Sequence, residues 1–342
     1  MSGLPDLVAS SIGLIGAEST PGVQSAAQPS PFASELLAWY DANARDLPWR
    51  ANRDPYRVWL SEIMLQQTRV AAVLEHYRRF LRRFPTIQKL AAARESSVLA
   101  AWSGLGYYRR ARMLHRAARI VVKEYGGNFP RTSTDLRTLP GIGRYTSAAI
   151  ASIAFGEPAV VVDGNVERVV SRLTGAPLAG EPAWRKAGEL LDAARSGDFN
   201  QAMMELGATV CLPGQPRCLL CPVASFCATR GELRSSRSTE KQRKRTVRFA
   251  LSRRAGQVLL VQRSKDDSLM AGFWELPQVA LEPGGPMAFC LRHSITVTDY
   301  TVQVVEAARP PRLNGKWVPV SRLSSLPLTG LARKILRRAE VL

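Results

Sequence analysis

The spacing of apolar residues changes once along the chain, and this change limits the possible folds more than any other feature. From Phe32 to about Gly231, apolar residues recur three and four positions apart with breaks at Pro or Gly, which predicts helices. Later apolar runs are short, β-branched or alternating, which predicts strands before one closing helix. The 342 residues are enough for two cores. We predict a mainly helical domain at 32–232 and a small α/β domain at 247–342.

Two polar segments flank the helical domain. Residues 1–31 are rich in Ser, Pro, Ala and Gly and lack a basic n-region, so we predict a disordered tail rather than a signal peptide. Residues 233–246 are rich in Lys and Arg and contain almost no apolar side chains. This composition predicts an exposed basic linker between the two domains.

The charge of the chain indicates what kind of partner it binds. It has 47 Lys and Arg against 28 Asp and Glu, a formal net charge of +19. Such an excess favours a polyanion, nucleic acid before membrane, although a soluble protein with solvated basic faces would have the same composition. No apolar run reaches the length of a membrane span, so we expect no membrane partner.

Four of the five cysteines form one set with the spacing C-x6-C-x2-C-x5-C. Disulfides are one alternative, but nothing marks the chain as secreted. Structural zinc usually takes two C-x2-4-C hooks, whereas this set has one short hook and two wider gaps. Four thiolates around a larger object suit a [4Fe-4S] cluster, which we predict at 211–227. Its ligands would be Cys211, Cys218, Cys221 and Cys227, and the fifth cysteine, Cys290, is predicted to be a small buried apolar residue.

The segment LPGIGRYTSAAI, residues 139–150, places a Pro-Gly-x-Gly turn between two predicted helices. Glycine allows positive φ and close backbone approach, so Gly141 and Gly143 suit a tight turn. The second helix would present free N–H groups, to which a phosphate binds without base preference. An ordinary connection between two helices is the alternative.

Two acidic residues stand in informative surroundings. Glu62 lies among apolar residues in a run, 58–84, that is predicted to be one helix. Burial would raise the pKa of this carboxyl and prepare it to donate a proton near neutral pH, whereas an ion pair with Arg57 or Arg69 would not. Asp163 follows an apolar run and precedes a helix, so it is predicted to be a helix N-cap.

These motifs, in this order, resemble the endonuclease III and adenine glycosylase family of DNA repair enzymes. The turn resembles their helix–hairpin–helix, and the cysteine set resembles their cluster loop. WLSEIMLQQT closely resembles the catalytic stretch of the adenine glycosylases of the MutY type. The resemblance covers roughly residues 32–342. It implies a mainly α helix–hairpin–helix glycosylase domain with an iron–sulfur loop, followed by an α/β Nudix (MutT)-like domain.

The resemblance also implies a reaction. Glu62 would protonate N7 of a flipped-out adenine, Asp163 would stabilise the oxocarbenium-like sugar, and water would complete hydrolysis at C1′. Relatives that also cleave the DNA backbone have a lysine where this chain has Tyr145. A phenol cannot form a Schiff base, so the enzyme would be monofunctional.

Further residues match family positions that contact DNA. Extruding a base costs a few kcal/mol of stacking, so a pocket must hold the base and a wedge must fill the gap. The predicted base pocket contains Leu47, Trp49, Arg50 and Gln201, and the predicted wedge contains Gln67 and Tyr107. For Trp49 an ordinary core position is the alternative, and for Tyr107 a buried aromatic in a helix turn.

The C-terminal domain resembles the front half of a Nudix fold in the segment GQVLLVQRSKDDSLMAGFWELPQV. The acidic Nudix metal box is absent, which argues for recognition rather than pyrophosphate hydrolysis. In the family this domain reads 8-oxoguanine through a Phe-Ser-His loop. This chain has Ile295, Thr296 and Val297 there, so Thr296 keeps a hydroxyl but the histidine is replaced.

The resemblance therefore implies a base-excision-repair enzyme that removes adenine opposite 8-oxoguanine or guanine in double-stranded DNA. We expect it to carry a [4Fe-4S] cluster, to act as a monomer, and to be cytoplasmic, nucleoid-associated and bacterial. An endonuclease III-like glycosylase for oxidised pyrimidines is one alternative, which Glu62 disfavours. A non-catalytic DNA-binding protein and a nucleotide pyrophosphatase are the others.

Overall fold

The computed structural model describes residues 29–233, 243–264, 266–267, 270–281, 287–295, 298–307 and 315–342. Most of the predicted tail and linker, at 1–28 and 234–242, lies outside the described residues. Thr296 and Val297 lie outside them too, as does the side chain of Ile295. No helix in the described part of the chain combines the length and apolarity that crossing a bilayer requires.

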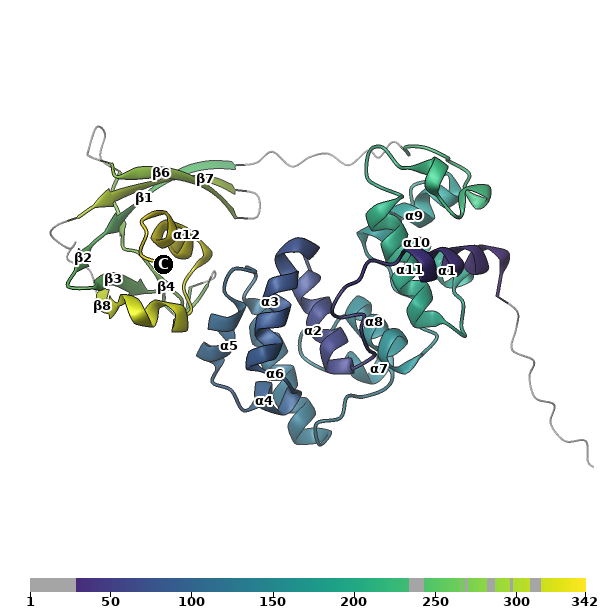
Figure 1. Cartoon of the computed structure of the whole chain (residues 1–342), viewed down its shortest axis with the longest axis horizontal. Coiled ribbons are helices and arrows are strands. Elements are labelled where there is room, and N and C mark those ends of the chain that lie inside the picture. The colour runs from purple at the N-terminus through teal and green to yellow at the C-terminus, as the bar shows by residue number, and fades with distance from the viewer. Residues whose placement is uncertain are drawn as a thin grey trace, which may run out of the picture.

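The described region from Pro31 to Phe226 is mainly helical, as predicted, and consists of two lobes (Figure 1). The first lobe has a core that includes Trp59, Phe80 and Trp102. Its helices are α2 Pro55–Leu65, α3 Val70–Arg83, α4 Ile87–Ala91, α5 Glu95–Trp102, α6 Arg109–Glu124, α7 Ser133–Leu136 and α8 Arg144–Phe155.

The second lobe joins the N-terminal helix to segments far along the chain. Its core contains Phe32, Leu36 and Phe199. Its helices are α1 Pro31–Asn43, α9 Gly164–Thr174, α10 Glu181–Leu190 and α11 Ser196–Thr209, with the short 3-10 turns η1 Cys218–Leu220 and η2 Ala224–Phe226 after them. Because α1 packs on α11, this lobe forms only when residues before α2 meet residues after α8.

The run at 58–84 is two helices, so the prediction of a single helix was wrong. The chain turns between α2 and α3 at Gln67, whose φ is 55° although no Gly or Pro stands there. The guanidinium of Arg110 donates to the carbonyls of Ile63, Met64 and Gln66, which are left unpaired where α2 ends. A distant arginine therefore satisfies this helix end, which no local sequence pattern indicates.

The C-terminal domain contains two small sheets and a helix, as the change of period predicts. One sheet has the order β5-β1-β7-β6 and the other β2-β3-β4, with β8 paired to β3. α12 packs through Leu331, Ile335 and Leu336 into the core of this domain. The elements are β1 Arg243–Leu251, β2 Arg253–Arg254, β3 Gln257–Gln262, β4 Trp274–Glu275, β5 Gln278–Val279, β6 Phe289–Ile295, β7 Thr298–Glu306, β8 Gly315–Pro319, η3 Val320–Ser325 and α12 Gly330–Arg338.

Two details of this domain differ from the sequence predictions. β1 begins at Arg243, inside the segment predicted as linker, because its exposed basic start pairs in parallel with β7 from Thr298 onward. Cys290 is exposed rather than buried. It lies on the edge strand β6, where Phe289 and Leu291 point inward and Cys290 therefore points outward.

The C-terminal domain packs against the turn between α5 and α6. The ring of Phe273, which is fully buried, lies 4.0 Å from the ring of Tyr108. The Tyr108 hydroxyl and the Ser103 hydroxyl both donate to the carbonyl of Leu328, at 3.3 and 3.2 Å. Arg112 donates to the carbonyl of Ala271. This contact places the β-domain beside the first lobe, opposite the second one (Figure 1).

Candidate active site

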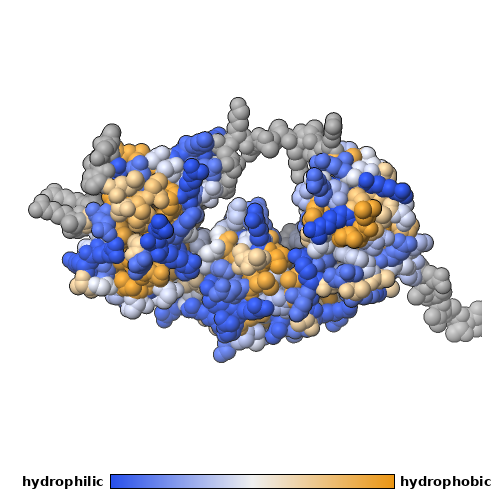
Figure 2. All heavy atoms as spheres, turned by 45° about the horizontal axis from the view of Figure 1, so that its top comes forward, coloured by the Kyte–Doolittle hydropathy of each residue, from blue (hydrophilic) through white to orange (hydrophobic). Residues whose placement is uncertain are grey.

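A cavity of about 1470 Å³ lies where the two lobes and the C-terminal domain face one another. Figure 2 shows the molecule hollowed between the C-terminal domain and the second lobe, with hydrophilic side chains on both sides. The cavity brings together every residue that the sequence placed in the catalytic, base-pocket, wedge and phosphate sets. They are Leu47, Trp49, Arg50, Glu62, Gln67, Tyr107, Gly141, Gly143, Tyr145, Asp163 and Gln201.

Glu62 is a buried acid in the wall of this cavity. It comes from α2, whose first turn is capped by Asp54, and only 6% of its surface is exposed. Tyr145 donates its hydroxyl to Oε2 of Glu62 at 2.8 Å. Burial raises the pKa of Glu62 to about 7, against the lowering effect of the Tyr145 hydrogen bond. The described residues show no ion pair between Glu62 and either Arg57 or Arg69, so that alternative is wrong.

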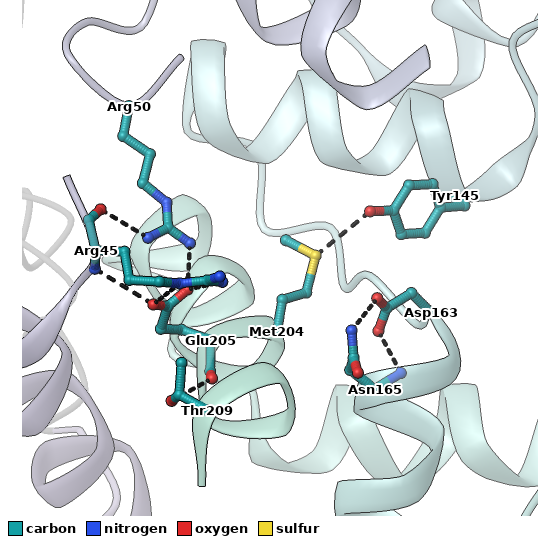
Figure 3. Close-up of polar contacts among 8 residues, drawn as sticks. All are labelled: Arg45, Arg50, Tyr145, Asp163, Asn165, Met204, Glu205 and Thr209. Carbon is teal, nitrogen blue, oxygen red and sulfur yellow. Dashed lines mark hydrogen bonds and ion pairs between the residues drawn. The ribbon is translucent and has the colours of Figure 1, made fainter. Parts of the chain in front are cut away.

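Tyr145 holds Glu62 from α8, which packs against α2 in the same lobe. It is the second residue of α8, directly after the hairpin, and its hydroxyl also lies 3.4 Å from Sδ of Met204 (Figure 3). Burial and the charges of Glu62 and Asp163 raise the pKa of the phenol well above its usual value. Tyr145 is therefore a neutral hydrogen-bond donor at physiological pH.

Asp163 caps α9 and faces the same cavity. Its Oδ1 accepts the backbone N–H groups of Asn165 and Val166, at 2.9 and 2.8 Å, which confirms the predicted N-cap. Its Oδ2 accepts a hydrogen bond from Nδ2 of Asn165 at 3.0 Å (Figure 3). Arg168 donates to Oδ1 of the same asparagine. Three donors thus hold this carboxylate in place, as suits an anion.

Glu205, a buried acid that the sequence reading missed, fixes one wall of the cavity. Arg45 donates to it at 2.6 and 2.8 Å, and Arg50 donates to it at 2.8 Å (Figure 3). Burial raises the pKa of Glu205, but the hydrogen bonds and charges of the two arginines outweigh it and leave the pKa below its usual value. The sequence did contain a signal for Glu205: it is a glutamate in the apolar run FNQAMMELG. It follows Gln201 by four residues and therefore lies on the same helix face.

The two glycines of the hairpin differ in what they require. Gly141 has a φ of 80°, and a Cβ there would lie 2.5 Å from Cβ of Met113, so glycine is needed for both reasons. Gly143 has a φ of −92° and open space around it, so positive φ does not explain it. It is the N-cap of α8 and has no side chain to occupy the free N–H groups of that helix.

The predicted base-pocket residues lie close together, and Trp49 also serves the core. It is 7% exposed and packs edge-on against Tyr77. Arg50 lines the cavity but directs its guanidinium to Glu205 and to the carbonyl of Arg45.

The predicted wedge residues are both exposed and both strained. Tyr107 is 46% exposed, so the alternative of a buried aromatic is wrong; its neighbour Tyr108 is the buried one. Gln67 and Tyr107 have φ values of 55° and 47°, a region that costs non-glycine residues about 1–3 kcal/mol each.

The four clustered cysteines lie in the loop after α11. All are partly exposed, and the pKa of Cys221 is raised by burial and by the nearby Cys211, Cys227 and Cys218. Arg172 donates to Sγ of Cys211 and the backbone N–H of Arg230 to Sγ of Cys227. In the described part of the chain, no group of three or more possible ligands is arranged to hold a metal ion. The donor chemistry nevertheless fits a thiolate-bound group, because the sulfurs are neighbours and accept N–H donors.

Comparison with known proteins agrees with this site. A family model described as HhH-GPD superfamily base excision DNA repair protein matches residues 60–189. The adenine DNA glycosylase of Homo sapiens is 41% identical over 322 residues, covering 75% of this chain and 59% of the relative. That of Arabidopsis thaliana is 40% identical over 297 residues, covering 72% and 47%. The chain thus spans about half to three fifths of these relatives. Animal and plant relatives stand beside bacterial ones, so a bacterial origin is not borne out.

Solved structures extend the comparison. A thermostable thymine-DNA glycosylase shares 32% identity with a TM-score of 0.55, covering 58% of this chain and 94% of that one. An endonuclease III trapped on DNA shares 24% identity with a TM-score of 0.51, which shows the fold alone. The helical domain thus shares the fold of solved DNA glycosylases. The chain belongs to the HhH-GPD superfamily of base excision DNA repair proteins.

The two buried acids of the cavity predict opposite effects of substitution on stability. Folding raises the pKa of Glu62 from 4.5 to about 7, so the folded state loses stability relative to the unfolded state as pH rises through this window. Glu62→Gln lacks this loss and should be about 3 kcal/mol more stable than the parent protein at pH 8, but not at pH 4.

Glu205→Gln is the matched control for this measurement. The pKa of Glu205 is lowered on folding, so its stabilising contribution is present at neutral pH and is lost as pH falls through the folded pKa. This variant should be less stable than the parent at pH 8, and the difference should shrink in acid. Urea unfolding at several pH values measures both; an unstabilised Glu62→Gln at pH 8 contradicts the burial argument.

Proposed function

We propose that the protein is a monofunctional DNA glycosylase that hydrolyses the N-glycosidic bond of adenine mispaired with 8-oxoguanine or guanine. One observation carries the proposal: two carboxyl groups, Glu62 with a pKa raised by burial and Asp163 held by N–H donors, face one cavity from the two lobes. Relatives described as adenine DNA glycosylases support the choice of base.

In the proposed reaction, Glu62 supplies the proton that the departing adenine needs. A carboxyl with a pKa near 7 is about half protonated at neutral pH and is a strong enough acid to assist departure. Tyr145 keeps the carboxyl oriented by its hydrogen bond to Oε2. The anionic Asp163 stabilises the positive charge that develops on the sugar, and water attacks C1′.

The residues around the cavity support cleavage without a covalent enzyme–sugar amine. Among the described residues that line it there is no lysine, and Tyr145 stays protonated. A Schiff base needs an amine, so the reaction ends with an abasic site.

The remaining residues of the cavity suit an extrahelical base and its DNA. Leu47, Trp49, Arg50 and Gln201 offer apolar and polar surface to the base. Gln67 and Tyr107 are exposed at the cavity and would fill the gap in the duplex. The turn at Gly141 and Gly143 would bind a backbone phosphate at the start of α8. A net charge of +19 favours binding to double-stranded DNA. We propose that the protein acts on it as a monomer.

We propose a Nudix-like recognition role for the C-terminal domain. His293 and Ser294 of this domain line the cavity on the side away from Asp163's lobe. They directly precede the segment with Thr296, which we propose contacts the 8-oxoguanine base opposite the adenine.

We propose that Cys211, Cys218, Cys221 and Cys227 hold a [4Fe-4S] cluster, which would tie together the loop after α11. The cluster would supply structural stability to the lobe that carries Asp163. Analysis of iron and acid-labile sulfide in purified protein should find about four of each per chain. One zinc per chain without sulfide would contradict the cluster.

Adenine release from duplexes containing A opposite 8-oxoguanine, G or C tests the proposed activity. The protein should cleave the first two, and duplexes with G opposite T or with an oxidised pyrimidine should not react. Above pH 7 the rate should fall as Glu62 loses its proton. Glu62→Gln should lower the rate by about 100- to 10,000-fold with duplex binding retained. Unchanged turnover by this variant refutes the acid assignment.

Asp163→Asn is the companion variant, because asparagine can still cap α9 while it removes the negative charge. It should unfold at nearly the parent's urea concentration yet release adenine far more slowly. Adenine release at the parent's rate would show that Asp163 only caps the helix and takes no part in the reaction.

Borohydride trapping tests the absence of an amine nucleophile. With abasic DNA the protein should form almost no covalent adduct, because Tyr145 offers no amine. Tyr145→Lys is the matched variant and should give a detectable adduct. Efficient trapping by the parent protein overturns the monofunctional assignment.

A further inference from the structure

Arg110, in the first turn of α6, is half-buried and has no carboxylate partner among the described residues. Its guanidinium bonds instead to main-chain carbonyls. Nη1 donates to Ile63 and Met64, at 2.7 and 3.1 Å, and to Gln66. A half-buried guanidinium that donates to several main-chain carbonyls at once holds those backbone segments together, which an exposed arginine does not do.

The second nitrogen of this guanidinium spans two separate loops. Nη2 donates to Oγ1 of Thr68 at 3.2 Å, in the loop between α2 and α3. It also donates to the carbonyls of Leu105 and Gly106, at 3.2 and 3.4 Å, in the loop between α5 and α6. One side chain therefore fixes the distance between two loops that are some forty residues apart in sequence.

Both loops have the same unusual feature at their tips. Gln67 and Tyr107 each adopt positive φ, each is exposed, and each lines the cavity. The ring of Tyr107 lies over the guanidinium of Arg110, with 5.3 Å between the ring centre and Cζ. Neither tip contains proline, and Gln67 has no glycine beside it. The local sequence therefore does not favour positive φ at Gln67, and the bonds to Arg110 stabilise this backbone conformation.

We propose that Arg110 is a positioning residue that holds Gln67 and Tyr107 at a fixed spacing, so that both enter the duplex together when the base is extruded. The inference rests on the proposed glycosylase function, and it assigns Arg110 a role without contact to the reacting atoms. Arg110 also bonds to the C-terminal end of α2, about one turn after Glu62. The same side chain therefore fixes the position of the wedge residues relative to the acid.

Arginine is required for this role because of its shape. The guanidinium presents donors in a rigid plane with two terminal nitrogens, whereas lysine has one ammonium that cannot reach both loops. Arg110→Lys therefore keeps the charge and breaks the bridge. Arg116 on the same helix is exposed, and Arg116→Lys is the matched control.

The first experiment uses the free protein and needs no activity. Hydrogen exchange of the amides at 66–69 and 105–108 should speed up together, about tenfold, in Arg110→Lys and stay unchanged in Arg116→Lys. If both loops of Arg110→Lys keep the protection of the parent protein, the claim that Arg110 links the two loops is wrong.

The second experiment measures base extrusion in a complex with DNA. A duplex with the fluorescent adenine analogue 2-aminopurine at the target position should brighten with the parent protein. Arg110→Lys should lower the extruded fraction about tenfold with little change in duplex affinity, and lower kcat rather than raise KM.

A double-mutant cycle separates positioning from general damage to the fold. In the background Gln67→Ala with Tyr107→Ala, Arg110→Lys should have almost no further effect on extrusion. An equal loss in both backgrounds overturns the inference. If the parent protein neither extrudes nor releases adenine, the proposed function fails, and the exchange measurement still decides the bridge.

Discussion

The buried carboxyl of Glu62 is the constraint on which the rest of the site depends. A carboxylate out of water is costly, so Glu62 keeps its proton to near neutrality because its burial outweighs the hydrogen bond from Tyr145, which orients the carboxyl but favours its charged form. Tyr145 in turn needs α8 to begin directly at the hairpin, and that turn needs glycine at position 141. The acid, the phenol and the tight turn therefore form one dependent series.

The same constraint explains why the helical domain has two lobes. Two carboxyl groups in one core would raise each other's pKa, and neither would be a reliable anion. Here Glu62 is buried in the first lobe, while Asp163 lies at the start of a helix in the second, with three N–H donors. The cavity at the seam lets the two acids face one ligand from different lobes, and the charge of Asp163 adds to the rise in the pKa of Glu62 that burial causes.

Sequence patterns predicted the elements well where their causes are local. The change from a period near four to a period of two separated the domains, and the predicted N-cap at Asp163 is present. The failures have distant causes. The break at Gln67 depends on Arg110, and the pairing of Glu205 with Arg50 joins residues 155 positions apart. Cys290 was misjudged because its strand alternates and it falls on the outward face. Residue roles came from family resemblance, since spacing alone could not distinguish a cap from a catalytic carboxylate.

A common arrangement links the groups that face the cavity. Two of them are held by a polar side chain from another helix: Glu62 by Tyr145, and the backbone at Gln67 by Arg110. The neighbouring Tyr108 anchors the C-terminal domain through Phe273, so the wedge at Tyr107 and the domain contact share one turn. A shift of that domain would therefore act directly on the turn that carries the wedge, whereas Glu62 lies on α2, which is linked to this turn through the bonds of Arg110 to Ile63 and Met64.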